Sequence, residues 1–190
     1  VALNGGKPEV MNLTDMLKAF VAFREEVVAR RTKYLLMKCR ERAHVLVGLA
    51  IAVANIDEVI ELIRRAPDPA TAREQLMTRR WPAHDVAPLI RLIDDPRHKI
   101  NDDGTYNLSE EQAKAILELR LARLTALGRD EIAEELEKIG AEITDFLDIL
   151  GSRARIMSIV KDELIAVRDQ FATPRRSEIL DGGTDMEDED

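Results

Sequence analysis

The residue types best suited to chemistry are one cysteine and three histidines. Cys39 has no partner in a CxxC pair, and His44, His84 and His98 show no metal-ligand spacing with it or with one another. A lone cysteine allows no internal disulfide, which fits a reducing cytoplasm. The sequence therefore favours ordinary helical packing for Cys39, and surface or packing roles for the histidines, over redox or zinc chemistry.

Motifs for nucleotide binding and hydrolysis are missing from the 190 residues. The chain has no GxxxxGK[ST], GxGxxG or GxSxG segment. The acidic pairs Glu25-Glu26 and Glu134-Glu135 lie where we expect solvated helices, so paired-carboxylate chemistry is disfavoured. We predict no catalytic, cofactor-binding or metal site in this chain.

A basic cluster between residues 24 and 42 has two interpretations. Its bases outnumber the three acids Glu25, Glu26 and Glu41 by four, and they are Arg24, Arg30, Arg31, Lys33, Lys38, Arg40 and Arg42. Such a cluster could guide a DNA duplex electrostatically. It could equally be neutralised by a Glu-rich partner helix, which is the interpretation the sequence favours. No aromatic residues alternate with the bases to stack on single strands.

Two long apolar stripes must position any function. Their residues recur at alternating steps of four and three, which is typical of a coiled coil. The first stripe is Leu13, Met16, Phe20, Phe23, Val27, Tyr34 and Met37; the second is Ile132, Leu136, Ile139, Ile143, Phe146, Leu150, Met157, Val160, Leu164, Val167 and Phe171. We expect the stripes to pair antiparallel, with Leu13 beside Phe171 and Tyr34 beside Leu150, so that the chain leaves and returns at one end.

Each stripe fails at one arginine, Arg30 or Arg153, and the expected pairing sets both failures at one level. Arg153 also follows Gly151-Ser152, where helix propensity is low. Two facing cations in a seam are unfavourable unless they reach water or a carboxylate. We predict a local break there, with Arg30, Gly151 and Arg153 forming a hinge. The alternative is a helix irregularity without motion.

Capping and breaker residues divide the chain between the stripes. We expect Asn12 or Thr14 to begin a helix that runs to about Ala54, and Asn55 with Glu58 to cap the next. We also expect short helices over 56–66, 70–79 and 86–93, followed by a loop over 94–106. A further helix should begin at Ser109, capped with Gln112, and run through Leu127. Gly128 should separate this helix from the second stripe.

The helix expected over 112–127 has apolar residues around most of its circumference, so it should be covered on two sides. One side can pack on the short helices of residues 45–93, and the simplest cover for the remaining apolar surface is the same helix of a second chain across a two-fold axis. The predicted interface residues are Gln112, Ala113, Ile116, Leu117, Arg120, Leu121 and Leu124. The alternative is a central helix buried within one chain.

Composition limits the remaining possibilities. Aromatic residues make up 4% and charged residues 34% of the chain, so any core is small and aliphatic. The longest apolar stretch, Val45 to Ala54, is too short to span a membrane, and no secretory signal is visible. Residues 181–190 carry six of the acids behind the net charge of −8 and predict a flexible linker.

The sequence thus predicts an all-α fold, in which a long antiparallel two-helix coiled coil carries a small globular helical dimerisation domain at its tip. Asn4-Gly5-Gly6 suggests a small hairpin at the start of the chain. The expected regions are a remnant of a preceding domain at 1–11, an outgoing helix at 12–44, a globular domain at 45–128, a returning helix at 129–172, and an acidic linker at 173–190.

Three blocks of sequence, at 40–57, 111–125 and 168–179, are similar to the A subunits of bacterial DNA gyrases, which are type IIA DNA topoisomerases. The likeness covers essentially the whole chain, and the segment around Trp81-Pro82 favours gyrase over topoisomerase IV. This resemblance implies the coiled coil and the exit gate, or C-gate, with dimerisation through the helix near Ser109. It also implies that the acidic linker at 173–190 leads toward a C-terminal domain. An unrelated coiled-coil adaptor that binds a protein partner is the alternative.

The resemblance also implies what the whole enzyme does. A cytoplasmic A2B2 assembly, completed by the gyrase B subunits, passes one DNA duplex through another and introduces negative supercoils, using ATP and Mg²⁺ bound outside this fragment. The family's nucleophile is a tyrosine in an Arg-Tyr context of a preceding domain. Tyr34, expected to pack on the seam, and Tyr106 match neither, so we expect this fragment to be inactive alone.

Overall fold

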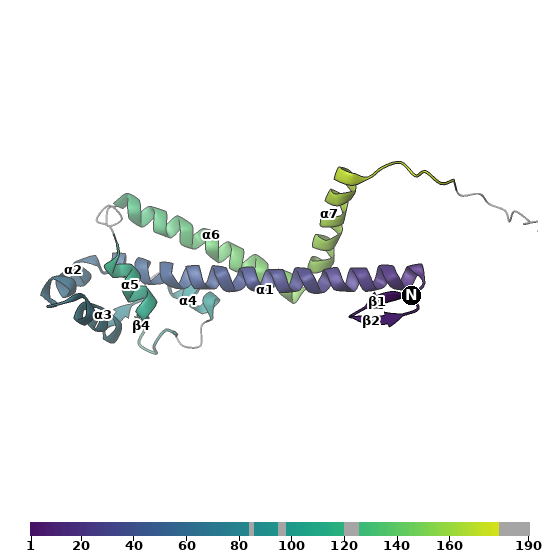
Figure 1. Ribbon diagram of the computed structural model, residues 1–190. Helices are drawn as coiled ribbons and strands as arrows, with labels where there is room; N and C mark the ends of the chain where they lie inside the picture. The colour runs from purple at the N-terminus through teal and green to yellow at the C-terminus, as the bar shows by residue number, and fades with distance from the viewer. Residues whose placement is uncertain (84–85, 95–97, 120–125, 179–190) are drawn as a thin grey trace, which may run out of the picture.

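A computed structural model describes residues 1–83, 86–94, 98–119 and 126–178 (Figure 1). Its elements are β1 (Ala2–Asn4), β2 (Lys7–Glu9), α1 (Leu13–Ala54), α2 (Ile56–Arg65), α3 (Pro69–Thr78), β3 (Arg80–Pro82), α4 (Ala87–Ile93), β4 (Thr105–Asn107), α5 (Glu110–Leu117), α6 (Ala126–Gly151) and α7 (Arg153–Phe171). The expectation of an all-α fold with a long helix is confirmed.

Helix α1 is the axis of the molecule (Figure 1). The Asn12 side chain caps it by accepting a hydrogen bond of 2.8 Å from the Asp15 backbone N–H, as expected for an N-cap. Its 42 residues make it about 63 Å long at 1.5 Å per residue. Short elements gather around its C-terminal end, and the β1–β2 hairpin lies near its start.

Helix α6 runs antiparallel to α1 and packs on it (Figure 1). Its predicted seam is confirmed over about three turns, because Ile132, Leu136, Ile139 and Ile143 are all buried. They belong to the main core, which also contains α1 residues such as Leu46.

The seam expected on α1 is wrong. Leu13, Phe20, Phe23, Tyr34 and Met37 are all exposed, and Tyr34 keeps 57% of its surface. A neighbouring stripe is buried instead, formed by Val28, Thr32, Leu36 and Ala43. Thr32 tolerates burial because its hydroxyl donates to the Val28 carbonyl at 2.9 Å. The aromatic side chains of α1 therefore lie on the solvent side, while aliphatic side chains and one threonine are buried.

The returning helix breaks at Ser152, which separates α6 from α7 with an extended backbone (φ −131°, ψ 108°). Helix α7 then turns away from α1 instead of following it (Figure 1). Leu13 and Phe171, the expected neighbours, are 72% and 68% exposed, so neither is buried against the other and that pairing is wrong. The break is where Gly151-Ser152 predicted it.

The globular end differs from expectation in two places. The segment expected as a loop contains β4, which pairs antiparallel with β3 and sets Trp81 opposite Tyr106. Both aromatic side chains are buried. The helix that begins after Ser109 ends at Leu117 and not at Leu127, and Gly128 lies inside α6, so it is not a separator.

Two local signals had different outcomes. The N-terminal hairpin is confirmed, and its turn uses the positive φ of Gly5 (57°) and Gly6 (83°). Asn55 precedes α2 but makes no side-chain cap, because its amide donates to the Ile51 carbonyl at 2.8 Å and closes α1 instead. The predicted capping box with Glu58 is therefore wrong.

Candidate functional site

The predicted interface helix begins with a buried capping box. The Ser109 hydroxyl accepts from the Gln112 backbone N–H at 3.2 Å, and the Gln112 side-chain oxygen accepts from the Ser109 N–H at 2.9 Å. This reciprocal pair satisfies two backbone donors at the start of α5. The sequence predicted this box correctly.

Gln112 also ties α5 to α1 and to the small sheet. Its side-chain nitrogen donates to the His44 carbonyl at 2.6 Å and to the Tyr106 hydroxyl at 3.2 Å. The His44 ring nitrogen Nε2 lies 2.7 Å from the Ser109 hydroxyl oxygen. The network fixes α5 across α1, and Gly48, a glycine inside the last two turns of α1, is the sequence signal for this close crossing.

Burial places the expected interface residues in two groups. Gln112, Ala113 and Ile116 are 0%, 0% and 3% exposed within their own chain, so a second chain has no access to their side chains. Leu117 is half-buried against the same core. Arg120, Leu121 and Leu124 lie outside the described residues. A dimer contact by this segment stays a prediction, and it falls on Leu117 and the residues that follow.

The two seam arginines do not face each other. Arg153 pairs with Glu25 at 2.7 and 3.0 Å, and Arg30 pairs within its own helix with Glu26 at 3.6 Å. Both arginine side chains are mostly exposed. The prediction of two facing cations is therefore wrong, because each arginine reaches a carboxylate and water.

A second, smaller core holds the start of α7 against α1. Val28, Ile149, Ile156 and Val160 are buried together there. Beside them the Glu163 carboxylate bridges Arg24 and Arg31 of α1, with both contacts at 2.5 Å. Hydrogen bonding to Arg31 lowers the pKa of Glu163, and hydrogen bonding to Arg153 lowers the pKa of Glu25. The junction between α6 and α7 thus combines a position of low helix propensity with ion pairs and apolar contacts that hold α7 on α1.

Five of the seven bases in the basic cluster on α1 form ion pairs. Besides the contacts to Glu163 and Glu26, Arg42 pairs with Glu135 of α6, and Lys38 with Glu41. This arrangement supports the salt-bridged interpretation over a surface free to attract DNA.

The candidate nucleophiles lie in unreactive settings. Burial raises the pKa of the Cys39 thiol, and its hydrogen bond to Glu142 (3.4 Å) raises it further, so the thiol stays protonated. Tyr34 is exposed beside Lys38, whose nitrogen lies 5.9 Å from the ring centre. The rings of His44 and His98 are 4.9 Å apart, and His84 lies outside the described residues.

Within the part of the chain that the structure describes, no three His, Cys, Asp or Glu side chains converge in a way that would hold a metal ion. The described helices also include none with both the length and the apolar surface needed to cross a membrane.

Comparisons with known proteins match most or all of the chain. The family of DNA gyrase and topoisomerase IV A subunits matches residues 1–165. The DNA gyrase A subunit from Granulibacter bethesdensis is 52% identical over 189 residues, and that from Rickettsia bellii is 50% identical over 190. The DNA gyrase A subunit from Salmonella typhimurium is 45% identical over 199 aligned residues. Each alignment covers 100% of this chain but only 20%, 21% and 23% of the relative, so the chain spans about a fifth of these proteins.

Proposed function

Because this chain belongs to the family of DNA gyrase and topoisomerase IV A subunits, we propose that it is the exit-gate arm of a gyrase A subunit, with its dimerisation region at the tip. The family match sets aside an unrelated coiled-coil adaptor. In this proposal the arm holds two copies together on the far side of the cavity through which a DNA duplex leaves.

The observation that carries the proposal is the way α1 and α5 are joined. Helix α1 is about 63 Å long and brings the globular end well away from the N-terminal hairpin. At that end the Gln112 network fixes α5 rigidly across α1. A gate contact needs a long arm whose tip is held firmly in place. A force on the tip then moves the whole arm and does not separate α5 from α1.

The rest of the proposed activity belongs to the larger assembly. Two gyrase A subunits and two gyrase B subunits would pass one duplex through another in the cytoplasm and introduce negative supercoils. ATP and Mg²⁺ would bind outside this chain, and a tyrosine outside it would cleave DNA. This chain would contribute no catalytic residue and would be inactive alone.

The helix break supports a hinge as part of the same proposal. The backbone loses helical geometry at Ser152, while the Arg153–Glu25 and Glu163 ion pairs and the small core around Val28 hold α7 on α1. Exposed ion pairs are weak and exchange readily with water. They would let the α6–α7 junction change angle when the arms separate.

Sedimentation velocity of the 190-residue chain over a concentration series tests the gate contact. We expect a dimer that the double variant Leu117→Arg, Leu121→Arg converts to a folded monomer. A matched variant, Leu147→Arg, changes a leucine that is 38% exposed on α6, and it should remain dimeric. A wild-type chain that stays monomeric at every concentration would contradict a self-sufficient gate contact, and equal loss of the dimer in both variants would contradict its location.

A further inference from the structure

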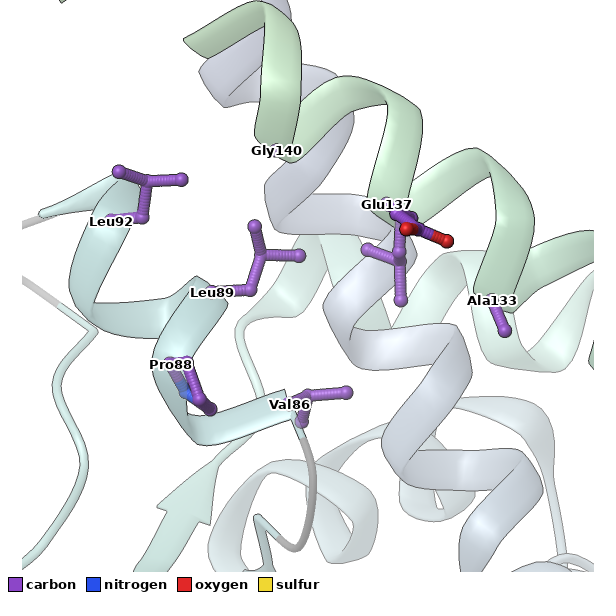
Figure 2. Close-up of a pocket in the computed structure, with 8 residues that line it drawn as sticks. Val86, Pro88, Leu89, Leu92, Ala133, Glu137 and Gly140 are labelled. Atoms are coloured by element: carbon purple, nitrogen blue, oxygen red, sulfur yellow. The ribbon is translucent and has the colours of Figure 1, made fainter. Parts of the chain in front are cut away.

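An apolar groove lies between α4 and α6 (Figure 2). Its volume is about 380 Å³, which lies within the range of roughly 300–1,000 Å³ for ligand sites. The lining residues are Val86, Pro88, Leu89 and Leu92 on the α4 side and Ala133, Leu136, Glu137 and Gly140 on α6. In Figure 2 the side chains of Val86 and Leu89 point toward α6 across the opening.

Small residues make the α6 wall approachable. Ala133 and Gly140 line the groove two turns apart, and a Cβ placed on Gly140 would lie 3.3 Å from the Leu89 Cδ1 atom. The wall from Ala133 to Gly140 is about 10 Å long at 1.5 Å per residue. That length equals the distance between the first and last apolar positions of an i, i+3, i+7 set on a docking helix, so the groove fits two turns of a third helix.

The edge of the groove carries unneutralised negative charge. Asp130, Glu134 and Glu137 recur at i, i+4 and i+7, so they form one stripe on α6. All three are exposed, and the structure describes no ion pair for any of them. Other acids of the same helix are already engaged, such as Glu135 with Arg42 and Asp145 with Arg155. Among the acids of α6 for which the structure describes no ion pair, Asp130, Glu134 and Glu137 form a stripe beside the apolar wall, whereas Glu131 lies on another face of the helix.

We propose that this groove is a docking site for an amphipathic helix of a partner protein, with apolar side chains between α4 and α6 and Lys or Arg side chains against Asp130, Glu134 and Glu137. The apolar wall supplies burial, while the acidic stripe selects a basic helix and fixes its orientation. This inference does not depend on the proposed gate function, because it uses neither α5 nor the α6–α7 junction.

The test uses a synthetic Leu/Lys amphipathic helical peptide about four turns long. Calorimetric titration into the 190-residue chain should show saturable binding of one peptide per chain. Amide chemical shifts should move at Ala133, Glu137 and Gly140, whereas a peptide of the same composition with a scrambled order should not bind.

Charge variants separate a built site from general attraction to an acidic chain. Glu134→Lys with Glu137→Lys should weaken binding roughly tenfold or more, because like charges then face each other at the edge. Glu131→Lys with Asp162→Lys changes the net charge equally but away from the groove, and it should change the affinity by less than about threefold. A Leu/Glu peptide should bind the first variant better than it binds the wild type. Ala133→Phe, which fills the groove, should abolish Leu/Lys binding while the circular dichroism spectrum stays helical.

Other occupants give distinct results, and each would overturn the proposal. Equal weakening by both charge pairs would mean non-specific attraction. If Ala133→Phe converts a dimer of this chain to a monomer, the occupant is a second copy. If the wild type binds a small apolar dye but no peptide, and Ala133→Phe abolishes the dye binding, the groove is a small-molecule site.

Discussion

Gly48 of α1 and Gln112 of α5 lie in such close contact that a Cβ on Gly48 would be 2.6 Å from both the Cβ and Cγ atoms of Gln112. No side chain other than hydrogen fits there unless one helix moves. The contact joins the long arm to the proposed gate helix, so the crossing of these two helices depends on a single glycine.

Gly48→Ala should therefore destabilise the chain, although alanine is the better helix former. We expect a loss of about 1–3 kcal/mol from overpacking. Urea unfolding followed by circular dichroism measures it. Gly151→Ala is the matched control, because a Cβ on Gly151 meets nothing within 4 Å, and it should be neutral or stabilising by up to about 1 kcal/mol. A stable Gly48→Ala protein would contradict the close crossing.

Gln112→Met keeps much of the side-chain shape but removes every hydrogen bond of the amide. The Ser109 N–H would lose its side-chain acceptor, so we expect a loss of about 1–3 kcal/mol. Ser109→Ala should cost about 1 kcal/mol through the lost cap. Glu111→Gln, on the exposed side of α5, is the control and should change stability by less than about 0.5 kcal/mol. Equal stability of Gln112→Met and wild type would contradict the network.

Trp81 is the one tryptophan of the chain and is fully buried, with its indole N–H donating to the Leu76 carbonyl at 2.9 Å. Trp81→Ala should destabilise the globular end by about 3–5 kcal/mol. Thermal unfolding by circular dichroism measures the effect. Phe171→Ala removes an aromatic ring that is 68% exposed and should leave the midpoint nearly unchanged. Similar midpoints for the two variants would contradict the core position of Trp81.

The ion pairs at the α6–α7 junction predict a pH dependence. Arg31 and Arg153 lower the pKa values of Glu163 and Glu25 in the folded chain. Carboxylates with lowered pKa values stabilise the fold above their unfolded pKa of about 4.3, and this stabilisation is lost as the pH falls through the lower folded values. At pH 7 the wild type should therefore have a higher urea unfolding midpoint than the double variant Glu25→Gln, Glu163→Gln.

The difference between wild type and that double variant should shrink as the pH falls below about 4. Glu131→Gln, an exposed acid for which the structure describes no ion pair, controls for the loss of a carboxylate and should follow the wild type. A difference that stays constant from neutral to acidic pH would assign the effect to packing and not to charge.

The hinge predicts that helix propensity at the break controls the angle of α7. Gly151→Ala with Ser152→Ala favours a continuous helix and removes the Ser152 cap, which accepts from the Arg155 N–H at 3.3 Å. Spin labels at Leu17→Cys and Arg168→Cys, in a Cys39→Ser background, report the distance between α1 and α7. We expect the double alanine variant to shift and narrow the distance distribution. Ser158→Ala, within α7, is the control, and identical distributions in all three proteins would contradict a hinge.

Local signals in the sequence predicted the elements better than their contacts. Asn12, Ser109 with Gln112, and Gly151-Ser152 each marked a helix end correctly, because caps and breakers act within a few residues. The seam of α6 was also predictable, since its apolar residues form one stripe.

The seam of α1 was not predictable in the same way. Two stripes lie side by side on this helix, and the one with larger side chains is exposed while Thr32 and Ala43 face α6. Periodicity identifies a stripe but does not say which of two neighbours meets the partner. The β3–β4 pair was missed because each strand has three residues and their partners are distant in sequence. Ile116 looked available to a second chain because the sequence does not show that α5 packs on α1 and α3.

The length of α1 makes it a lever. If the helix turns as a rigid body about its N-terminal end, a rotation of about 10° carries the far end through roughly 11 Å, given about 63 Å of helix. Small angular changes at the base are thereby converted into displacements as large as the width of a helix at the tip. Stiffness of the rod would then matter as much as the strength of any contact it carries, since a rod that bends absorbs the rotation before it reaches the end.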